Sequence, residues 1–222
     1  MPIYKIKNEN FFKKWTPGMA YVLGFFAADG NMLKNKRGAH FIEFEITDKD
    51  LLYKIKKLLC SNHKITERNR NKKWQKSFRL QIGSKIIFND LLKLGLTPAK
   101  SKTIDLPNVP NKYFHHFLRG YFDGDGNVLS GYFKKPDRKN KSYTLRTRFT
   151  SGSKLILDNL KIKLSNIIET GGSLSENGNA WRLNYGIDDS KKIFNFMYNN
   201  GNVKKLIYLK RKYKIYLKAG VA

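Results

Sequence analysis

Two related stretches decide the fold, YVLGFFAADG at residues 21–30 and FLRGYFDGDG at residues 117–126. Both end in Asp-Gly, both carry a glycine five residues before that aspartate, and both are otherwise mainly apolar or aromatic. The two aspartates, Asp29 and Asp125, are 96 residues apart. A repeated pattern at a long, fixed interval is the sequence signature of a duplicated structural unit.

Two further pairs of stretches support the duplication. FRLQIG at 78–83 corresponds to WRLNYG at 181–186, and SKIIFN at 84–89 corresponds to SKKIFN at 190–195. The order is kept along the chain while the interval grows slightly, as loop insertions in one copy would cause. We therefore expect two domains, an N-terminal repeat at 1–105 with a linker from about residue 96, and a C-terminal repeat at 106–222.

Each copy has the same predicted order of elements, αββαββα. In the first copy, Pro17 suits the first turn of a helix and Thr47 is the expected cap of another. The expected elements there are a helix at 17–28, strands at 31–36, 40–47, 64–70 and 74–82, and helices from about 48 and at 84–94. In the second copy we expect helices at 110–123, 153–169, 189–199 and 203–218, with strands at 127–133, 143–150, 173–176 and 180–187.

Composition points to a polyanionic partner. Lysine and arginine number 44 against 17 aspartate and glutamate residues, which gives a formal net charge of +27 in 222 residues. Such a charge opposes compact folding unless a polyanion relieves it, and nucleic acid is the first candidate. The hydrophobic fraction of 41% excludes a wholly disordered basic tail. No apolar run is long enough for a transmembrane helix.

The paired motifs suggest a metal site. On a helix, Gly24 and Ala28 share one face, as do Gly120 and Gly124, and small residues at this spacing let two helix backbones approach closely. We expect the two helices to pack together and to bring Asp29 and Asp125 to neighbouring ends. Because adjacent carboxylates repel each other, a cation such as Mg²⁺ would stabilise them, and it could activate water for phosphodiester hydrolysis.

At these residues the chain resembles the LAGLIDADG homing endonucleases. The two motifs are 22–30 and 118–126, and the single-chain type with two motifs is a pseudo-symmetric monomer. The resemblance implies an α+β fold of two αββαββα repeats, packed through the paired motif helices, with antiparallel sheets that form a DNA-binding saddle. It implies a site-specific endonuclease that cuts both strands across the minor groove and leaves short 3′ overhangs. Motif one departs from the family pattern because it has Ala27 where motif two has Asp123.

The resemblance also implies roles for individual residues. Asp29 and Asp125 would bind Mg²⁺, or Mn²⁺ or Ca²⁺ in its place, together with the main-chain carbonyls of Ala28 and Gly124. A basic residue near the metals matches Lys100 in the first copy, and in the second copy Lys212 is chosen over Lys210. A polar residue that positions water matches Asp48, with its counterpart at or near Ser151.

Basic and amide side chains in the predicted hairpins are candidate DNA contacts. Arginine can read guanine, asparagine and glutamine can read adenine, and most contacts in such interfaces go to phosphates. The predicted DNA-binding residues are Lys34, Lys36, Arg37, Arg68, Arg70, Lys72, Lys73, Gln75, Lys76, Arg79, Gln81, Lys134, Arg138, Lys139, Arg146, Arg148, Asn179, Arg182 and Asn184.

Other functions stay open from the sequence. An RNA maturase that assists intron splicing, or a non-catalytic DNA-binding protein, could use the same basic scaffold, as could a structural ribonucleoprotein component. The four histidines do not have a zinc-binding spacing, and no phosphate-binding glycine loop is present. Cys60 is expected in the core on an apolar helix face. With one cysteine and no secretory signal, we expect an intracellular protein, cytoplasmic in a bacterium or archaeon or else organellar.

Overall fold

The chain folds into two compact units in the computed structural model, which describes residues 5–69, 75–134, 139–199 and 203–221. The first unit contains residues up to Lys100 together with residues 107–124. The second contains residues 101–106 and those from Asp125 onward. The helix that carries the second motif therefore packs with the first unit. The division of the sequence repeats at residues 105 and 106 stays a prediction.

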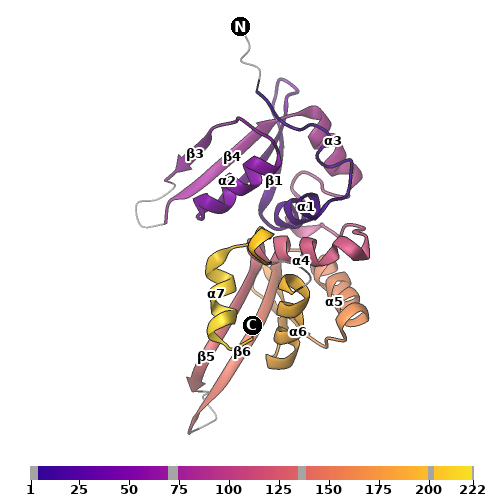
Figure 1. The fold of residues 1–222 in the computed structure, drawn as a ribbon. Coiled ribbons are helices and arrows are strands. Elements are labelled where there is room, and N and C mark those ends of the chain that lie inside the picture. The colour runs from indigo at the N-terminus through magenta and orange to yellow at the C-terminus, as the bar shows by residue number, and fades with distance from the viewer. Residues whose placement is uncertain (1–4, 70–74, 135–138, 200–202, 222) are drawn as a thin grey trace. The chain divides into compact units, whose positions relative to one another are not determined.

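The first unit is a four-stranded antiparallel sheet covered by helices on one face. Its strands lie in the order β1-β2-β4-β3, and α1, α2 and α3 pack against strands of this sheet. Ile42, Phe44 and Leu80 are completely buried on the covered face. The elements are α1 (Pro17–Asp29), β1 (Gly30–Lys34), β2 (His40–Ile46), α2 (Lys49–Leu58), β3 (Ile65–Arg68), β4 (Ser77–Gly83), α3 (Lys85–Lys93) and α4 (Asn111–Asp125) (Figure 1).

The second unit has a four-stranded sheet of the same architecture. Its sheet has the order β5-β6-β8-β7, and Leu145, Phe149 and Leu183 form the buried face under α5 and α6. The elements are β5 (Gly126–Lys134), β6 (Lys141–Ser151), α5 (Lys154–Ile168), β7 (Ser173–Asn177), β8 (Ala180–Tyr185), α6 (Ile187–Tyr198), the 3-10 turn η2 (Val203–Lys205) and α7 (Lys210–Lys218). The two sheets with matching strand order confirm the predicted α+β fold of two related repeats.

The two motif helices pack through their glycines, as predicted. A Cβ added at Gly24 would overlap the carbonyl oxygen of Phe117 and lie 2.9 Å from the backbone nitrogen of Tyr121. A Cβ added at Gly120 would overlap the carbonyl oxygen of Tyr21 and lie 2.9 Å from the nitrogen of Phe25. The contacts are reciprocal, as they are when equivalent helices cross at a local twofold axis. Only glycine allows the two backbones to come this close.

A buried polar cluster lies at this helix crossing. The hydroxyl of Tyr21 donates a hydrogen bond of 2.6 Å to Asp123, and the guanidinium of Arg119 lies 5.5 Å from the centre of the Tyr21 ring. Arg119 and Asp123 are 2% and 1% exposed. In the duplicated sequence the equivalent of Asp123 is Ala27 and the equivalent of Tyr21 is Phe117. Asp123 in motif two therefore has a hydroxyl partner, Tyr21. An acid at position 27 of motif one would have no such partner, because Phe117 has no hydroxyl, and alanine is tolerated there.

His116 on α4 is held neutral by its surroundings. It is 7% exposed, and its Nδ1 accepts a hydrogen bond of 2.9 Å from Arg119. Burial, followed by the charge of Arg119 and by His115, lowers the pKa of His116 to about 3. Protonation would remove the acceptor and place a second positive charge beside a buried guanidinium.

This environment predicts a specific loss of stability in acid. The folded-state pKa of His116 lies below its unfolded value near 6.5. The contribution of His116 to the free energy of unfolding is therefore complete above pH 6.5 and is lost as the pH falls below it. Between pH 8 and pH 5 we expect the free energy of unfolding to fall by about 2 kcal/mol through this group. Urea unfolding of the wild type and of His116→Asn across this range measures the effect. Equal pH dependence in the two proteins would contradict it.

Three local expectations are wrong. Asp48, not Thr47, caps α2, because its extended backbone lets Oδ1 accept a bond of 2.9 Å from the nitrogen of Leu51. The expected helix at 203–218 is a short 3-10 turn followed by α7, because residues 206–209 leave the helix and bury Leu209 completely. Cys60 is exposed, since it follows the end of α2 and has a φ of 47°.

Candidate active site and nucleic-acid interface

Asp29 lies at the end of α1, next to the end of α4. It is the last residue of α1 and is exposed, while Gly30 starts β1 directly after it. A Cβ added at Gly124 of α4 would lie 2.5 Å from the Cβ of Ala28 and 3.5 Å from Oδ2 of Asp29. Asp125, which is half-buried, is the next residue after Gly124. The helix crossing thus places the Asp29 carboxylate beside the end of the second motif.

Lys100 is buried beside the end of motif one. Its side chain is 6% exposed and belongs to the 3-10 turn η1 (Lys100–Lys102). Its ammonium group donates a hydrogen bond to the carbonyl oxygen of Gly30 and lies 5.5 Å from the centre of the Phe26 ring. A buried lysine is uncommon, and this one is fixed at the residue that follows Asp29.

Lys212 is the corresponding candidate in the second unit. It lies in the first turn of α7 and is 4% exposed, whereas its neighbour Lys210 is exposed. Helix α7 packs against β5, the strand that starts directly after Asp125 (Figure 1). Burial thus distinguishes Lys212 from Lys210, and the catalytic role of Lys212 stays a prediction.

The two predicted water-positioning residues have structural partners. Asp48 is half-buried and caps α2, and the Oγ of Ser151, a residue 7% exposed, accepts a bond of 3.0 Å from the nitrogen of Ser153. By strand register, the equivalent of Asp48 is Ser153, whose hydroxyl donates to the carbonyl of Ile104 at 2.7 Å. Their roles in catalysis stay predictions.

The open face of the first sheet is polar and internally paired. Glu43 on β2 accepts hydrogen bonds from Arg79 at 2.9 Å and from Gln81 at 2.7 Å, both on β4. Glu45 accepts from Arg68 at 3.1 Å and from Ser77 at 2.6 Å. The predicted DNA contacts Arg68, Arg79 and Gln81 therefore lie together on this face.

The open face of the second sheet carries three arginines. Arg146 and Arg148 on β6 and Arg182 on β8 line a hollow of about 450 Å³, together with Asn184. The Nε of Arg148 donates to Asn184 at 2.8 Å. The pKa of Arg148 is lowered, first by burial and then by the charges of Arg182 and Arg146. The neighbouring positive charges repel one another, and an anionic ligand would relieve this repulsion.

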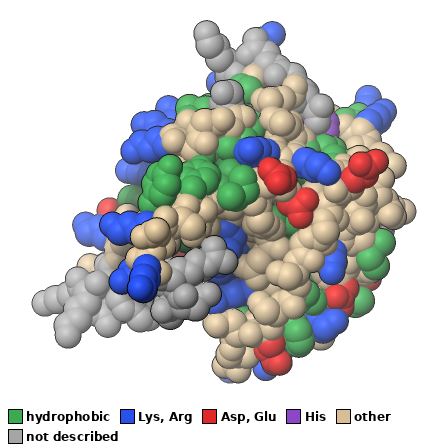
Figure 2. All heavy atoms as spheres, turned by 90° about the horizontal axis from the view of Figure 1, so that it is seen from below, with side chains coloured by type: hydrophobic (Ala, Val, Ile, Leu, Met, Phe, Trp, Pro, Cys, Tyr) green, Lys and Arg blue, Asp and Glu red, His purple; other side chains and the backbone are tan. Residues whose placement is uncertain are grey.

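The other DNA candidates that the structure describes lie at strand ends and turns. Lysine and arginine side chains are exposed at several places on the face drawn in Figure 2. The exposed candidates outside the two open faces are Lys34, Lys36, Arg37, Gln75, Lys76, Lys134, Lys139 and Asn179. Four others, Arg70, Lys72, Lys73 and Arg138, lie outside the described residues.

Glu43 and Glu45 were missed as members of the open face of the first sheet. Their alternation with Ile42, Phe44 and Ile46 already places them on the face opposite the core. The partners of the two acids lie on β3 and β4, and the register that sets these strands beside β2 is not readable from β2 alone.

Comparison with known proteins finds a family match within the first unit. Residues 17–94 match the family described as the LAGLIDADG-like domain. The match includes motif one and all four strands of the first sheet, and the resemblance predicted from the motifs is confirmed.

Two relatives come from Methanocaldococcus jannaschii. The uncharacterized protein MJ0398 is 28% identical over 122 residues, which are 52% of this chain and 41% of that protein. The DNA-directed RNA polymerase subunit Rpo1C is 30% identical over 149 residues, which are 65% of this chain and 15% of that protein. The chain thus spans less than half the length of either relative.

Solved LAGLIDADG structures share the fold across most of the chain. The homing endonuclease I-SmaMI bound to cleaved DNA has a TM-score of 0.63 and 18% identity, and the match covers 91% of this chain and 87% of that one. I-SmaMI bound to uncleaved DNA in the presence of calcium ions has a TM-score of 0.59 and 17% identity, with coverage of 89% and 87%. Among the described residues, no helix is long and apolar enough to cross a membrane.

Proposed function

We propose that this chain is a site-specific double-strand DNA endonuclease that hydrolyses phosphodiesters across the minor groove with a divalent metal and leaves short 3′ overhangs. The observation that carries the proposal is the crossing of α1 and α4 through Gly24 and Gly120, at whose end Asp29 lies beside Gly124. The LAGLIDADG-like domain and the DNA-bound structures of I-SmaMI support it.

The residues at the helix ends fit a hard cation. In the described part of the chain, no three His, Cys, Asp or Glu side chains gather into a metal cage. Mg²⁺ does not need one, since it binds through one or two carboxylates, waters and phosphate oxygens. Asp29 and Asp125, with the carbonyls of Ala28 and Gly124, would hold Mg²⁺, or Mn²⁺ or Ca²⁺. When bound, such an ion lowers the pKa of water and stabilises a leaving oxygen.

The other candidates would act on the DNA and the water. Lys100 and Lys212 are buried cations, and a cation near a phosphate stabilises negative charge that develops during hydrolysis. Asp48 and Ser151 would position water through their oxygens. The open faces of the two sheets would bind duplex DNA, with arginines and lysines on phosphates and with Gln81 and Asn184 among the residues that reach bases.

Selection followed by cleavage tests this function. Full-length protein is used to enrich bound molecules from a pool of randomised duplexes in Ca²⁺, and the enriched pool is then exposed to Mg²⁺ or to EDTA. We expect double-strand breaks in Mg²⁺ alone, with 3′ overhangs at one shared sequence. Binding without cleavage in Mg²⁺ or Mn²⁺ would overturn the nuclease proposal and favour a non-catalytic DNA-binding protein. Selective binding of intron RNA over duplex would favour a maturase.

A further inference from the structure

The strand pairings align the two sheets residue by residue. Gly30 pairs with Phe44 and Gly126 pairs with Phe149, while Phe44 pairs in turn with Leu80 and Phe149 with Leu183. The open face of each sheet therefore has the same rows of side chains. The aligned pairs on this face are Asn31 and Asn127, Gln81 and Asn184, Arg79 and Arg182, and Thr66 and Ser175.

At one position of these rows, the side chain is negative in the first sheet and positive in the second. The row Asn31–Glu43–Gln81 crosses the first sheet, and the row Asn127–Arg148–Asn184 crosses the second. The flanking residues are amides in both rows, and the central residue is Glu43 in one and Arg148 in the other. The neighbouring strand has an arginine on the same face, two residues from the amide of the row. It is Arg79 beside Glu43 and Arg182 beside Arg148.

Glu43 balances the charge of Arg79 and holds the polar side chains around it on the open face of the first sheet. It is 8% exposed, and its carboxylate accepts from Arg79 at 2.9 Å, from Gln81 at 2.7 Å and from Asn31 at 3.4 Å. A carboxylate paired with a guanidinium in a low-dielectric setting reduces what that guanidinium offers to phosphate. The same bonds hold the amide of Gln81 with its nitrogen toward Glu43, so its oxygen is the group left to face a ligand.

Arg148 has the opposite effect in the second sheet. It is half-buried between Asn184, to which it donates at 2.8 Å, and the charges of Arg146 and Arg182. The hollow that these arginines line has one acidic residue, Glu176, among its described lining. Three guanidiniums here face a single acid, whereas in the first sheet Arg79 and Arg68 each have a carboxylate partner.

We infer that Glu43 and Arg148 make the two sheets read DNA unequally: the second sheet supplies most of the phosphate-dependent affinity, and the first supplies a prearranged, nearly neutral surface for base recognition. The inference rests on the proposed DNA-binding function. Glu43 acts as a positioning residue for Arg79 and Gln81. Arg148 is a candidate for a direct contact to guanine or phosphate.

The inference predicts opposite effects of two matched substitutions on binding. Arg148→Gln removes a cation that releases a counterion on binding, so the slope of log affinity against log salt should become shallower by about 1. Glu43→Gln keeps the shape of the side chain but releases Arg79 toward phosphate. The slope should become steeper by up to about 1, and affinity for random duplex should rise while discrimination between sequences falls.

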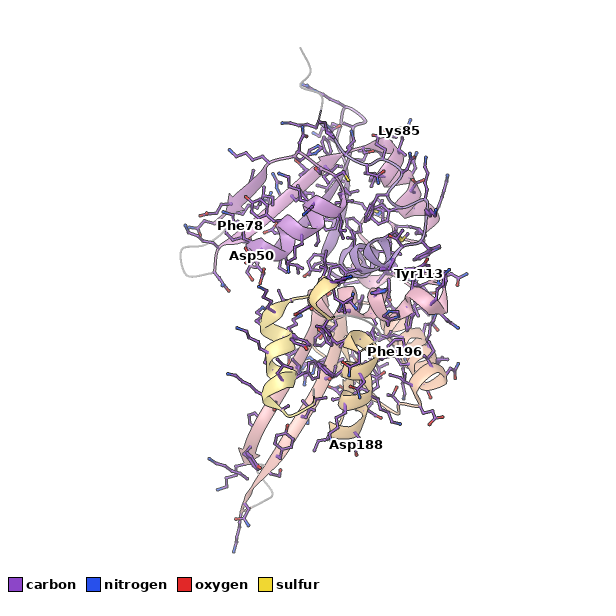
Figure 3. The ribbon with its side chains drawn as sticks, in the orientation of Figure 1. Asp50, Phe78, Lys85, Tyr113, Asp188 and Phe196 are labelled. Atoms are coloured by element: carbon purple, nitrogen blue, oxygen red, sulfur yellow. The ribbon has the colours of Figure 1, made fainter. Side chains whose placement is uncertain are left out.

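Controls separate these effects from bulk charge. Asp50→Asn makes the same charge change as Glu43→Gln, on α2 at the covered side of the first sheet, where Figure 3 labels Asp50. Lys161→Gln makes the same charge change as Arg148→Gln on α5, at the covered side of the second sheet. Binding is measured in Ca²⁺ by fluorescence anisotropy on random-sequence duplex and on the selected pool. Thermal melting checks that each variant is folded.

The outcomes distinguish the inference from the function it rests on. A steeper slope for Glu43→Gln and a shallower one for Arg148→Gln, with both controls near wild type, supports the inference. Slopes that change in the same direction, or a Glu43 variant equal to Asp50→Asn, overturn it while duplex binding stands. If Glu43→Gln does not fold, a slope of Arg148→Gln equal to that of Lys161→Gln is sufficient to overturn it. Folded wild type that binds no duplex contradicts the proposed function instead.

Discussion

Asp29→Asn is expected to lower the rate of duplex cleavage roughly thousandfold without loss of DNA binding. Asparagine keeps the size of the side chain but removes the charge that a divalent cation needs, and several kcal/mol of transition-state stabilisation depend on that cation. Asp125→Asn should have the same effect. Single-turnover cleavage of the Ca²⁺-selected duplex in Mg²⁺ measures the rate, and anisotropy measures binding.

Asp188→Asn is the matched control for these variants. Asp188 is an exposed acid in the first turn of α6, labelled in Figure 3, and its replacement makes the same chemical change. It should cleave like the wild type. Normal cleavage by either Asp29→Asn or Asp125→Asn would show that the corresponding carboxylate does not hold a metal needed for the reaction.

The second large effect concerns the helix crossing. Gly24→Leu places a side chain where the carbonyl oxygen of Phe117 now lies, so α1 and α4 must separate. We expect the free energy of unfolding to fall by about 3 kcal/mol or more, because backbone atoms cannot move aside as a flexible side chain can. Gly120→Leu should be equally damaging, since its contacts with Tyr21 and Phe25 are reciprocal. Urea unfolding followed by circular dichroism measures both.

Gly171→Ala provides the comparison for these glycines. A Cβ at Gly171 would meet its nearest atom, on Asp189, at an ordinary distance of 3.7 Å. This variant should unfold close to the wild-type midpoint. If Gly24→Leu matched it, the close approach of α1 and α4 would not be a feature of the protein in solution.

Much of the fold could be predicted from the sequence because the duplication makes each pattern occur twice. The spacing of Gly24 and Ala28 repeats at Gly120 and Gly124, and this repeated small-residue face predicted the helix pair correctly. The aligned pair Arg79 and Arg182 likewise follows from the repeated stretches at 78–83 and 181–186. Local patterns that occur once were less reliable, since Thr47 and Asp48 are both good caps and only the backbone course decides between them.

The candidate site was only partly readable. Lys212 is buried whereas Lys210 is exposed, and this difference depends on how α7 lies against β5. The choice of Lys212 as the catalytic candidate stays a prediction. The pairing of Glu43 with Arg79 joins residues 36 positions apart and depends on sheet register. The bond between Tyr21 and Asp123 joins residues 102 positions apart across the helix crossing. Long-range partners of this kind follow from topology rather than from the local sequence.

Metal binding by the two motif aspartates is the central claim, and electron paramagnetic resonance of Mn²⁺ tests it most directly. Full-length protein on the Ca²⁺-selected duplex is titrated with Mn²⁺, and the free ion is counted from its signal. The wild type should remove Mn²⁺ from solution, and a folded, DNA-bound Asp29→Asn, Asp125→Asn double variant should remove far less. Equal Mn²⁺ uptake by the two proteins would contradict the account.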